Sequence, residues 1–151
     1  MVAKPQDTAA LWFDIFNEIG IIEQLSRNAF ERVLQDGLSL AGFSVLNHYV
    51  RLELDHSTPT QLASAFQVTK GAMTNTLHRL EVLGFVSVDT NPEDGRGKIV
   101  RITPKGIKAR NQSIGALAPK LTEISGNLSR KEAADALPFL KNLRVFLDEN
   151  R

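Results

Sequence analysis

Six residues in the middle of the chain could together contact a nucleic acid. They are Lys70, Gly71, Thr74, Asn75, His78 and Arg79. Positions one, three and four apart lie on the same side of an α-helix, so these short polar and basic residues would share one face. An asparagine can pair with the edge of adenine, and lysine and arginine can hold phosphates. The alternative is the solvated face of a helix in an all-helical core, and these residues alone do not decide between the two.

A second group of polar residues lies in a segment dense in turn formers, residues 90–97. The flanking segments 85–89 and 98–103 alternate between apolar and polar residues, which predicts a β-hairpin. Arg96 is flanked by two glycines, and such small neighbours let a loop approach a nucleic-acid groove closely. The alternative is an ordinary solvated arginine in a turn.

The sequence lacks the residue patterns of an enzyme or a metal site. It has no cysteine, which excludes disulfides, thiolate ligands and cysteine nucleophiles. His48 and His56 are eight positions apart, so they lack the spacing that places two ligands side by side on a helix. Gly-x-Ser-x-Gly, paired-carboxylate and phosphate-binding glycine motifs are all missing from the sequence. We therefore expect no catalytic residues, no metal and no cofactor.

Two short helices would position the polar face. Thr58 and Gln61 form a capping box with Pro59 in the first turn, and Thr69 can cap the second helix after a turn at residues 67–68. The apolar residues of both helices follow helical spacing and are expected to be buried. They are Leu62, Ala65, Phe66, Ala72, Met73, Leu77, Leu80 and Leu83. A helix-turn-helix followed at once by a β-hairpin is a winged helix.

Long helical patterns flank this region on both sides. Before it, an apolar stripe predicts a helix over residues 7–34 that ends at Gly37, and Ser39 opens a helix that continues to about Leu54.

After the hairpin, a helix is expected to begin at residues 103–104 and to end at 126–127, with Gly115 and Pro119 bending or interrupting it. A second capping box at Ser129 begins the last helix.

The terminal helices carry more apolar surface than a small winged helix can cover, which favours a symmetric homodimer. The predicted fold is mainly α with a small β-hairpin wing. We expect an N-terminal dimerisation helix over residues 1–36, the winged helix-turn-helix over 37–106 and C-terminal dimerisation helices over 107–151.

The net positive charge of the chain lies around the predicted winged helix. Residues 58–110 carry eight basic and four acidic side chains, whereas the whole chain has a net charge of +1. A basic centre between acidic flanks is typical of a module that binds a polyanion such as double-stranded DNA. No apolar run approaches the roughly 18 residues of a membrane span, and the first residues do not form a signal peptide. We expect a cytoplasmic protein with no membrane partner.

In four stretches, the sequence resembles the multiple antibiotic resistance regulator (MarR) family of bacterial and archaeal transcription factors. They are residues 62–69, 77–86, 91–98 and 100–106. The resemblance implies that the second helix of the pair enters the major groove of DNA and that Arg96 reaches the minor groove. It also implies that Asp94 supports the wing loop and that Lys98 holds a phosphate. Many members have a basic residue just before the wing loop, where this chain has Val88 and Asp89.

The resemblance further implies a small effector, commonly an anionic aromatic compound, in the cleft between dimer helices and winged helix. Residues that could supply aromatic walls and a cationic anchor are expected to line it. They are Trp12, Phe16, Phe43, His48, Tyr49 and Arg51. The alternative for Trp12, Phe16 and Phe43 is packing in the core or the dimer.

The function implied is repression from a pseudo-palindromic operator by a homodimer that a ligand releases. One alternative is a constitutive, architectural DNA-binding protein without a ligand. Another is a winged helix that binds a protein, or an enzyme with an unfamiliar site.

Overall fold

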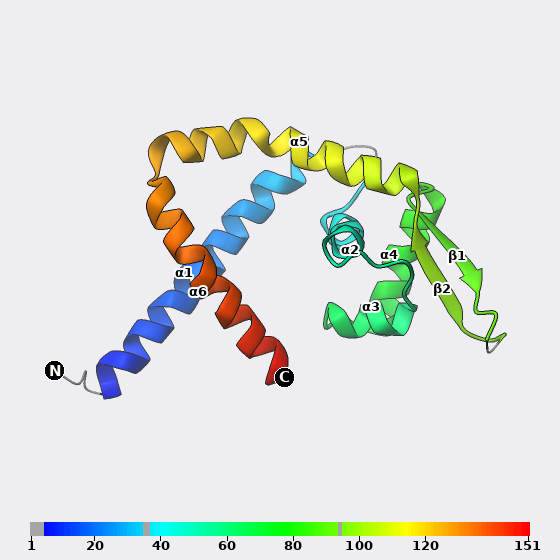
Figure 1. Ribbon diagram of the computed structural model, residues 1–151, viewed down its shortest axis with the longest axis horizontal. Coiled ribbons are helices and arrows are strands. Elements are labelled where there is room, and N and C mark those ends of the chain that lie inside the picture. Colours follow the sequence, from blue (N-terminus) through cyan, green and yellow to red (C-terminus); the bar gives the residue numbers. More distant parts are fainter. Residues whose placement is uncertain (1–4, 35–36, 94) are drawn as a thin grey trace. The chain divides into compact units, whose positions relative to one another are not determined.

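The computed structural model describes residues 5–34, 37–93 and 95–151, with side chains from residue 7 onward. Six helices and one two-stranded antiparallel sheet follow one another in the described residues (Figure 1). The elements are α1 (Pro5–Glu31), α2 (Leu40–Arg51), α3 (Pro59–Ala65), α4 (Lys70–Val82), β1 (Val86–Thr90), β2 (Lys98–Ile102), α5 (Pro104–Asn127) and α6 (Arg130–Glu149). The chain forms two compact units, Met1–Ala116 and Leu117–Arg151, which we describe separately.

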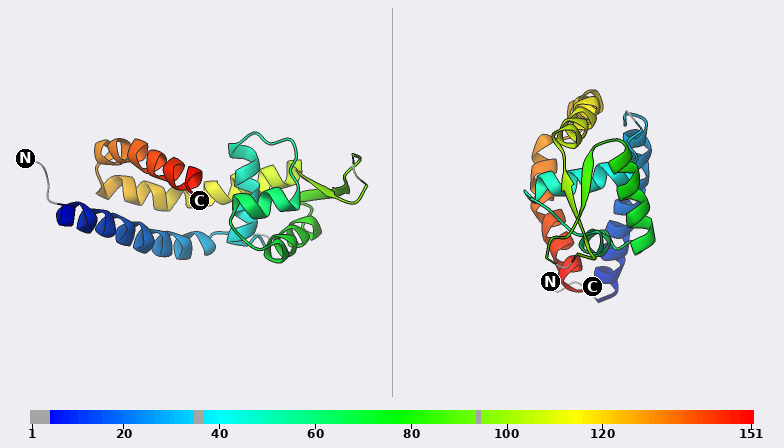
Figure 2. Two further views of the ribbon diagram at one scale, coloured as in Figure 1. Left: turned by 90° about the horizontal axis from the view of Figure 1, so that it is seen from below. Right: turned by 90° about the vertical axis from the view of Figure 1, so that its right-hand side faces the viewer.

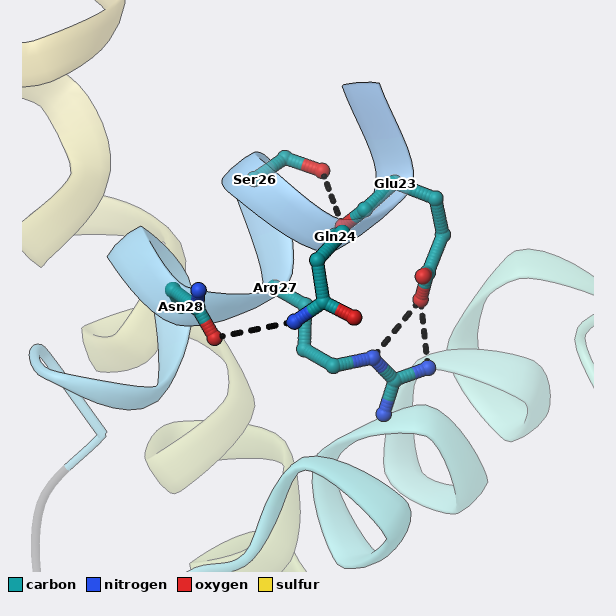
Figure 3. A network of polar contacts seen from close by, with 5 residues as sticks. All are labelled: Glu23, Gln24, Ser26, Arg27 and Asn28. Carbon is teal, nitrogen blue, oxygen red and sulfur yellow. Dashed lines mark hydrogen bonds and ion pairs between the residues drawn. The ribbon is translucent and has the colours of Figure 1, made fainter. Parts of the chain in front are cut away.

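Helix α1 is exposed along most of its length. Its second half carries polar pairs one turn apart, among them an ion pair between Arg27 and Glu23 (Figure 3). Near its end Phe30 packs edge-on against Phe43 of α2, with 4.4 Å between ring centroids. The helix ends at Glu31, earlier than predicted. Gly37 does have a positive φ of 74°, but it lies too far beyond the helix to cap it.

The three helices of the winged helix begin at the predicted caps. Ser39 Oγ accepts the amide hydrogen of Gly42, and Thr69 Oγ1 accepts that of Ala72. The capping box at the start of α3 is complete: Thr58 and Gln61 each bind the other's backbone amide through their side chains. These bonds satisfy amides that a helix start leaves unpaired.

The same helices end in closely similar turns. One residue past each C-cap has a positive φ, and the next amide donates back to a carbonyl five residues earlier. The residues with positive φ are Glu53, Gln67 and Gly84. Helix α2 therefore ends at Arg51 rather than near Leu54, because Glu53 adopts the left-handed conformation that closes the turn.

The core joins α2, α3, α4, the hairpin and the start of α5. Its most deeply buried side chains are Tyr49, Leu46, Leu62, Leu80, Val45 and Val100. Two predicted core positions are wrong, because Ala65 and Ala72 are exposed. Ala63 is buried instead, since α3 turns that side toward the core.

The hairpin pairs Val86 with Ile102 and Thr90 with Lys98, and it projects beyond helices α2 to α4 (Figure 2). Ser57 adds a third chain segment, because its amide and carbonyl both bond to Val100 of β2. Tyr49 Oη donates to the same Val100 carbonyl at 2.8 Å. The base of the hairpin is thus tied to the helices.

Helix α5 runs through Gly115 and Pro119 without the interruption that was one of the two expected outcomes, and the division between the two units falls between them. In the second unit, Ser129 Oγ accepts the amide hydrogen of Glu132 and starts α6, which continues through Pro138. None of the residues of α6, all of them described, is buried.

Candidate nucleic-acid interface

The outer face of α4 consists of exposed polar residues, as the sequence predicts. Lys70, Gly71, Thr74, Asn75, His78 and Arg79 are all exposed, as is the cap residue Thr69. On the inner face, Met73, Leu77 and Leu80 are buried. The Thr74 hydroxyl donates its proton to the Lys70 carbonyl at 2.8 Å, so its oxygen is left as an acceptor on this exposed residue. The helix thus presents donors, acceptors and two cations on one side.

Gly71 lies in the first turn of α4, where nothing in the fold requires a glycine. A Cβ at this position would meet nothing within 4 Å, and the residue has no positive φ. Glycine in a helix costs about 0.5–1 kcal/mol relative to alanine. The Ala72 amide is bound by Thr69, but no side chain at position 71 covers the rest of the helix start, and amides at a helix start can bind a phosphate.

The wing loop between the strands is shaped by Asn91. The Asn91 amide donates to the Gly97 carbonyl, its carbonyl accepts from Gly95, and its side chain accepts from the amide of Glu93. Gly95 has a φ of 64°, a left-handed value that suits glycine. Arg96 is exposed in this loop, and Asp94 lies outside the described residues.

Arg101 of β2 is a basic residue of the hairpin that was not predicted to be part of the site. Arg101 of β2 approaches Asp89 of β1, with 3.9 Å between Nη1 and Oδ2, and both side chains are substantially exposed. Lys98 is exposed at the mouth of the hairpin, opposite Thr90. Arg101 on the opposite strand therefore places a positive charge beside Asp89. This proximity follows from the pairing of the two strands and not from the sequence alone.

The residues that link α4 and the hairpin to α5 form a joint that we call the α4–α5 junction. They are Leu83, Gly84, Phe85, Thr103, Lys105 and Gly106. Thr103 Oγ1 donates to the Gly84 carbonyl at 2.7 Å, and the Thr103 amide donates to the Phe85 carbonyl at 3.0 Å. A Cβ at Gly106 would lie 2.1 Å from the Phe85 oxygen, so only glycine fits there. The junction sets the position of α4 on the rest of the unit.

The six residues predicted to bind an effector occupy different environments. Trp12 and Phe16 are exposed on α1, with 6.4 Å between their ring centroids, whereas Phe43 and Tyr49 are buried in the core. The other two residues of the set, His48 and Arg51, lie on α2, and the His48 ring packs at a tilt against Phe66, with 5.1 Å between ring centroids. An open hollow on α1 includes one of the six. It is lined by Phe16, Asn17, Gly20, Ile21, Gln24 and Leu25.

Burial shifts the pKa of two of these groups. It lowers the pKa of the His48 imidazole below its usual value, and the positive charge of Arg51 lowers this pKa further. It raises the pKa of the Tyr49 hydroxyl, which stays protonated and donates to Val100. The Tyr49 hydroxyl is therefore used in a hydrogen bond between α2 and β2.

Over the described part of the chain, no group of three or more His, Cys, Asp or Glu side chains is placed to hold a metal ion. Among the same residues, no helix is long and apolar enough to cross a membrane.

Known proteins resemble this chain in both sequence and fold. Residues 36–97 match the model of the MarR family. The multiple antibiotic resistance protein MarR of Salmonella typhimurium is 29% identical over 137 residues, which cover 86% of this chain and 95% of that protein. The crystal structure of the transcriptional regulator BldR from Sulfolobus solfataricus has a TM-score of 0.74 and 25% identity, covering 97% of this chain and 99% of BldR. Wild-type MarR from Escherichia coli, in its apo form, has a TM-score of 0.71 and 28% identity, covering 84% of this chain and 93% of its own.

The order of α2, α3, α4 and the hairpin is that of a winged helix-turn-helix, and the matched residues cover most of it. With relatives that are similar to it over nearly their whole length, the chain resembles the MarR family of transcriptional regulators, whose members are not enzymes.

Proposed function

We propose that the protein is a cytoplasmic repressor that binds a pseudo-palindromic operator as a homodimer. The observation that carries this proposal is the outer face of α4, where every predicted contact residue is exposed and a hairpin with exposed basic residues follows directly. Each α4 would enter one of two major grooves about one helical turn apart. The exposed apolar side chains of the helices in residues 1–36 and 107–151 would supply the dimer contacts.

In this proposal the exposed residues divide between reading bases and holding the backbone. Asn75 and Thr74 contact base edges, with His78 beside them, because an amide and an outward hydroxyl oxygen can discriminate bases. Lys70 and Arg79 hold phosphates, which set position and salt dependence.

At the wing, Arg96 enters the minor groove, Lys98 contacts the backbone and Asp94 supports the loop. The start of α4 would also contribute, with Thr69 and Gly71 beside a phosphate, because no side chain at position 71 covers the helix start.

The test begins with selection of bound sites from random DNA by the purified protein. We expect two half-sites whose centres lie about 10 base pairs apart. Asn75→Ala should relax the preference at one base pair at a cost of about 1–3 kcal/mol. Arg96→Ala should weaken binding to all sequences.

Matched controls lie on α6, where Asn142→Ala and Arg130→Ala make the same chemical changes at exposed positions. If Asn75→Ala and Arg96→Ala left affinity for the selected site at the level of these controls, the assigned interface would be wrong.

We also propose that a small anionic aromatic compound releases the protein from DNA. Trp12 and Phe16 offer exposed aromatic surface, and Arg51 offers a positive charge. A ligand that favours a dimer with wrongly spaced α4 helices would be coupled to DNA binding by about 1–3 kcal/mol, and the coupling would be reciprocal. A panel of aromatic carboxylic acids tests this, because unchanged operator affinity across the panel would favour a constitutive, architectural DNA-binding protein.

A further inference from the structure

Lys105 lies in the basic segment around the winged helix, but its ammonium group points to the end of α4. Nζ donates to the Leu83 carbonyl at 2.7 Å and lies 5.4 Å from the centre of the Phe85 ring. The side chain also runs beside Gly84, since a Cβ placed there would meet its Cδ and Nζ at 3.7 Å. One lysine from the first turn of α5 thus contacts three consecutive residues that end α4 and lead into β1.

The end of α4 leaves carbonyl groups for such a partner. The closing turn uses the carbonyls of Leu80 and Glu81, which accept from the amides of Phe85 and Gly84. Further along the chain, the Leu83 carbonyl accepts a hydrogen bond from the side chain of Lys105. A cation is favoured at this place because the carboxyl end of a helix carries a partial negative charge.

We propose that Lys105 is a positioning residue for DNA recognition: its ammonium fixes the carboxyl end of α4 relative to the wing and α5. This inference rests on the proposed function. Lys105 acts through the Leu83 carbonyl and the Phe85 ring, and the base-reading face of α4 lies on the same helix that these contacts hold. Loss of the ammonium leaves the outer face chemically unchanged but less firmly oriented against the wing.

A phosphate contact is the competing role for a lysine in a basic segment, and the two roles differ in their salt dependence. Each lost phosphate contact lowers the slope of log affinity against log salt by about 0.9. A positioning residue leaves that slope unchanged. It lowers affinity for the operator more than affinity for unrelated DNA, because binding to unrelated DNA rests on charge and not on the angle of α4.

The experiment compares Lys105→Met with the matched control Lys108→Met. Methionine keeps an unbranched stem over Phe85 and removes the charge and the donors. Lys108 lies less than one turn further along α5, is exposed and loses the same charge, so it corrects for the general effect of charge. Lys105→Arg restores a cationic donor and serves as the rescue.

Affinities for the selected operator and for an unrelated duplex are measured at several salt concentrations, with the active fraction set by stoichiometric titration. We expect Lys105→Met to lower operator affinity by about fivefold relative to Lys108→Met. Affinity for the unrelated duplex and both salt slopes should match the control, and Lys105→Arg should recover most of the operator affinity.

A salt slope that falls by about 0.9 for each Lys105 in the complex would overturn the positioning role, as would a proportional loss on both duplexes. Equal operator affinities for Lys105→Met and Lys108→Met would also overturn it. Lys105→Leu against Lys108→Leu gives the same comparison if the methionine variant does not fold. Failure of the proposed function looks different, because the wild-type protein would then prefer no DNA sequence.

Discussion

Gly71 occupies a position in α4 where the fold has room for a side chain and the helix would gain from one. In the proposed function, a phosphate group approaches the helix start at this point, beside Lys70.

Gly71→Ala should therefore change stability and DNA binding in opposite directions. The free energy of unfolding should rise by about 0.5 kcal/mol, because alanine favours a helix more than glycine does. Operator affinity should fall by about 1–3 kcal/mol, because the added methyl group crowds a close contact. Urea unfolding and a binding titration measure the two effects. Gly126→Ala in α5, also in open space, is the control for the stability gain.

His48 makes the stability of the winged helix depend on pH. Its pKa is lowered by burial and by Arg51, so the unfolded chain binds a proton more readily than the folded one. Stability is then full above about pH 6.5, the ordinary value for histidine, and falls as the pH drops below it.

His48→Gln should reduce this loss of stability in acid. The decrease in the urea midpoint from about pH 7.5 to about pH 5.5 should be smaller in the variant than in the wild type. Above about pH 7.5 the difference between the two proteins should stay constant. An identical acid decrease in both would show that His48 is not the group responsible.

The elements of the winged helix show which parts of a fold are readable from the sequence. The caps at Ser39, Thr58 and Thr69 rest on local patterns, and all three are confirmed. The predicted turn at residues 67–68 is also found after α3. The end of α2 was harder to predict, because it closes on Glu53 in a conformation that usually indicates glycine.

Contacts between elements were the least readable part of the site. The residues on the outer face of α4 follow from helical spacing alone, and their exposure is confirmed. Arg101 could not be placed beside Asp89 without the strand register, nor Lys105 on Leu83 without the angle between α4 and α5. Both appeared in the sequence only as members of a basic segment.

At the α4–α5 junction, the fit between elements depends on Gly106. Gly106→Ala would bring a methyl group within 2.1 Å of the Phe85 carbonyl oxygen, a backbone atom that also holds the Thr103 amide. We expect a loss of about 3 kcal/mol in the free energy of unfolding, measured in urea. Gly115→Ala, nine residues further along the same helix and in open space, should leave stability unchanged or raise it slightly. Equal stabilities for the two variants would mean that the junction is not tightly packed.

The molecule as a whole leaves apolar side chains exposed on its terminal helices. Leu11, Phe13 and Leu25 of α1 are more than half exposed, and Leu140 and Phe146 of α6 are also exposed. Apolar surface of this extent usually marks a protein interface. The sequence predicted these stripes, and a second copy of the chain is the partner in the proposed function.

Leu140→Glu should therefore weaken a dimer. A charge placed in an apolar interface should raise the dimer dissociation constant roughly thirtyfold, or about 2 kcal/mol. Sedimentation equilibrium measures it, and operator affinity should fall in parallel. The control is Asn142→Glu, which adds the same charge two residues on, near the opposite side of α6. A variant that dimerises as tightly as this control would exclude this part of α6 from the interface.

The Val100 carbonyl has a consequence for the order in which the protein assembles. It accepts from the Tyr49 hydroxyl, 51 positions earlier in the chain, and from the amide of Ser57. Until β2 has been synthesised, the tyrosine hydroxyl lacks its partner, and burying it without one is costly. Contacts this distant in sequence form slowly, because the loop between them must close first. A nascent chain that ends before residue 100 should thus lack a finished helix-turn-helix, and the proposed DNA-binding surface should form in a single cooperative step.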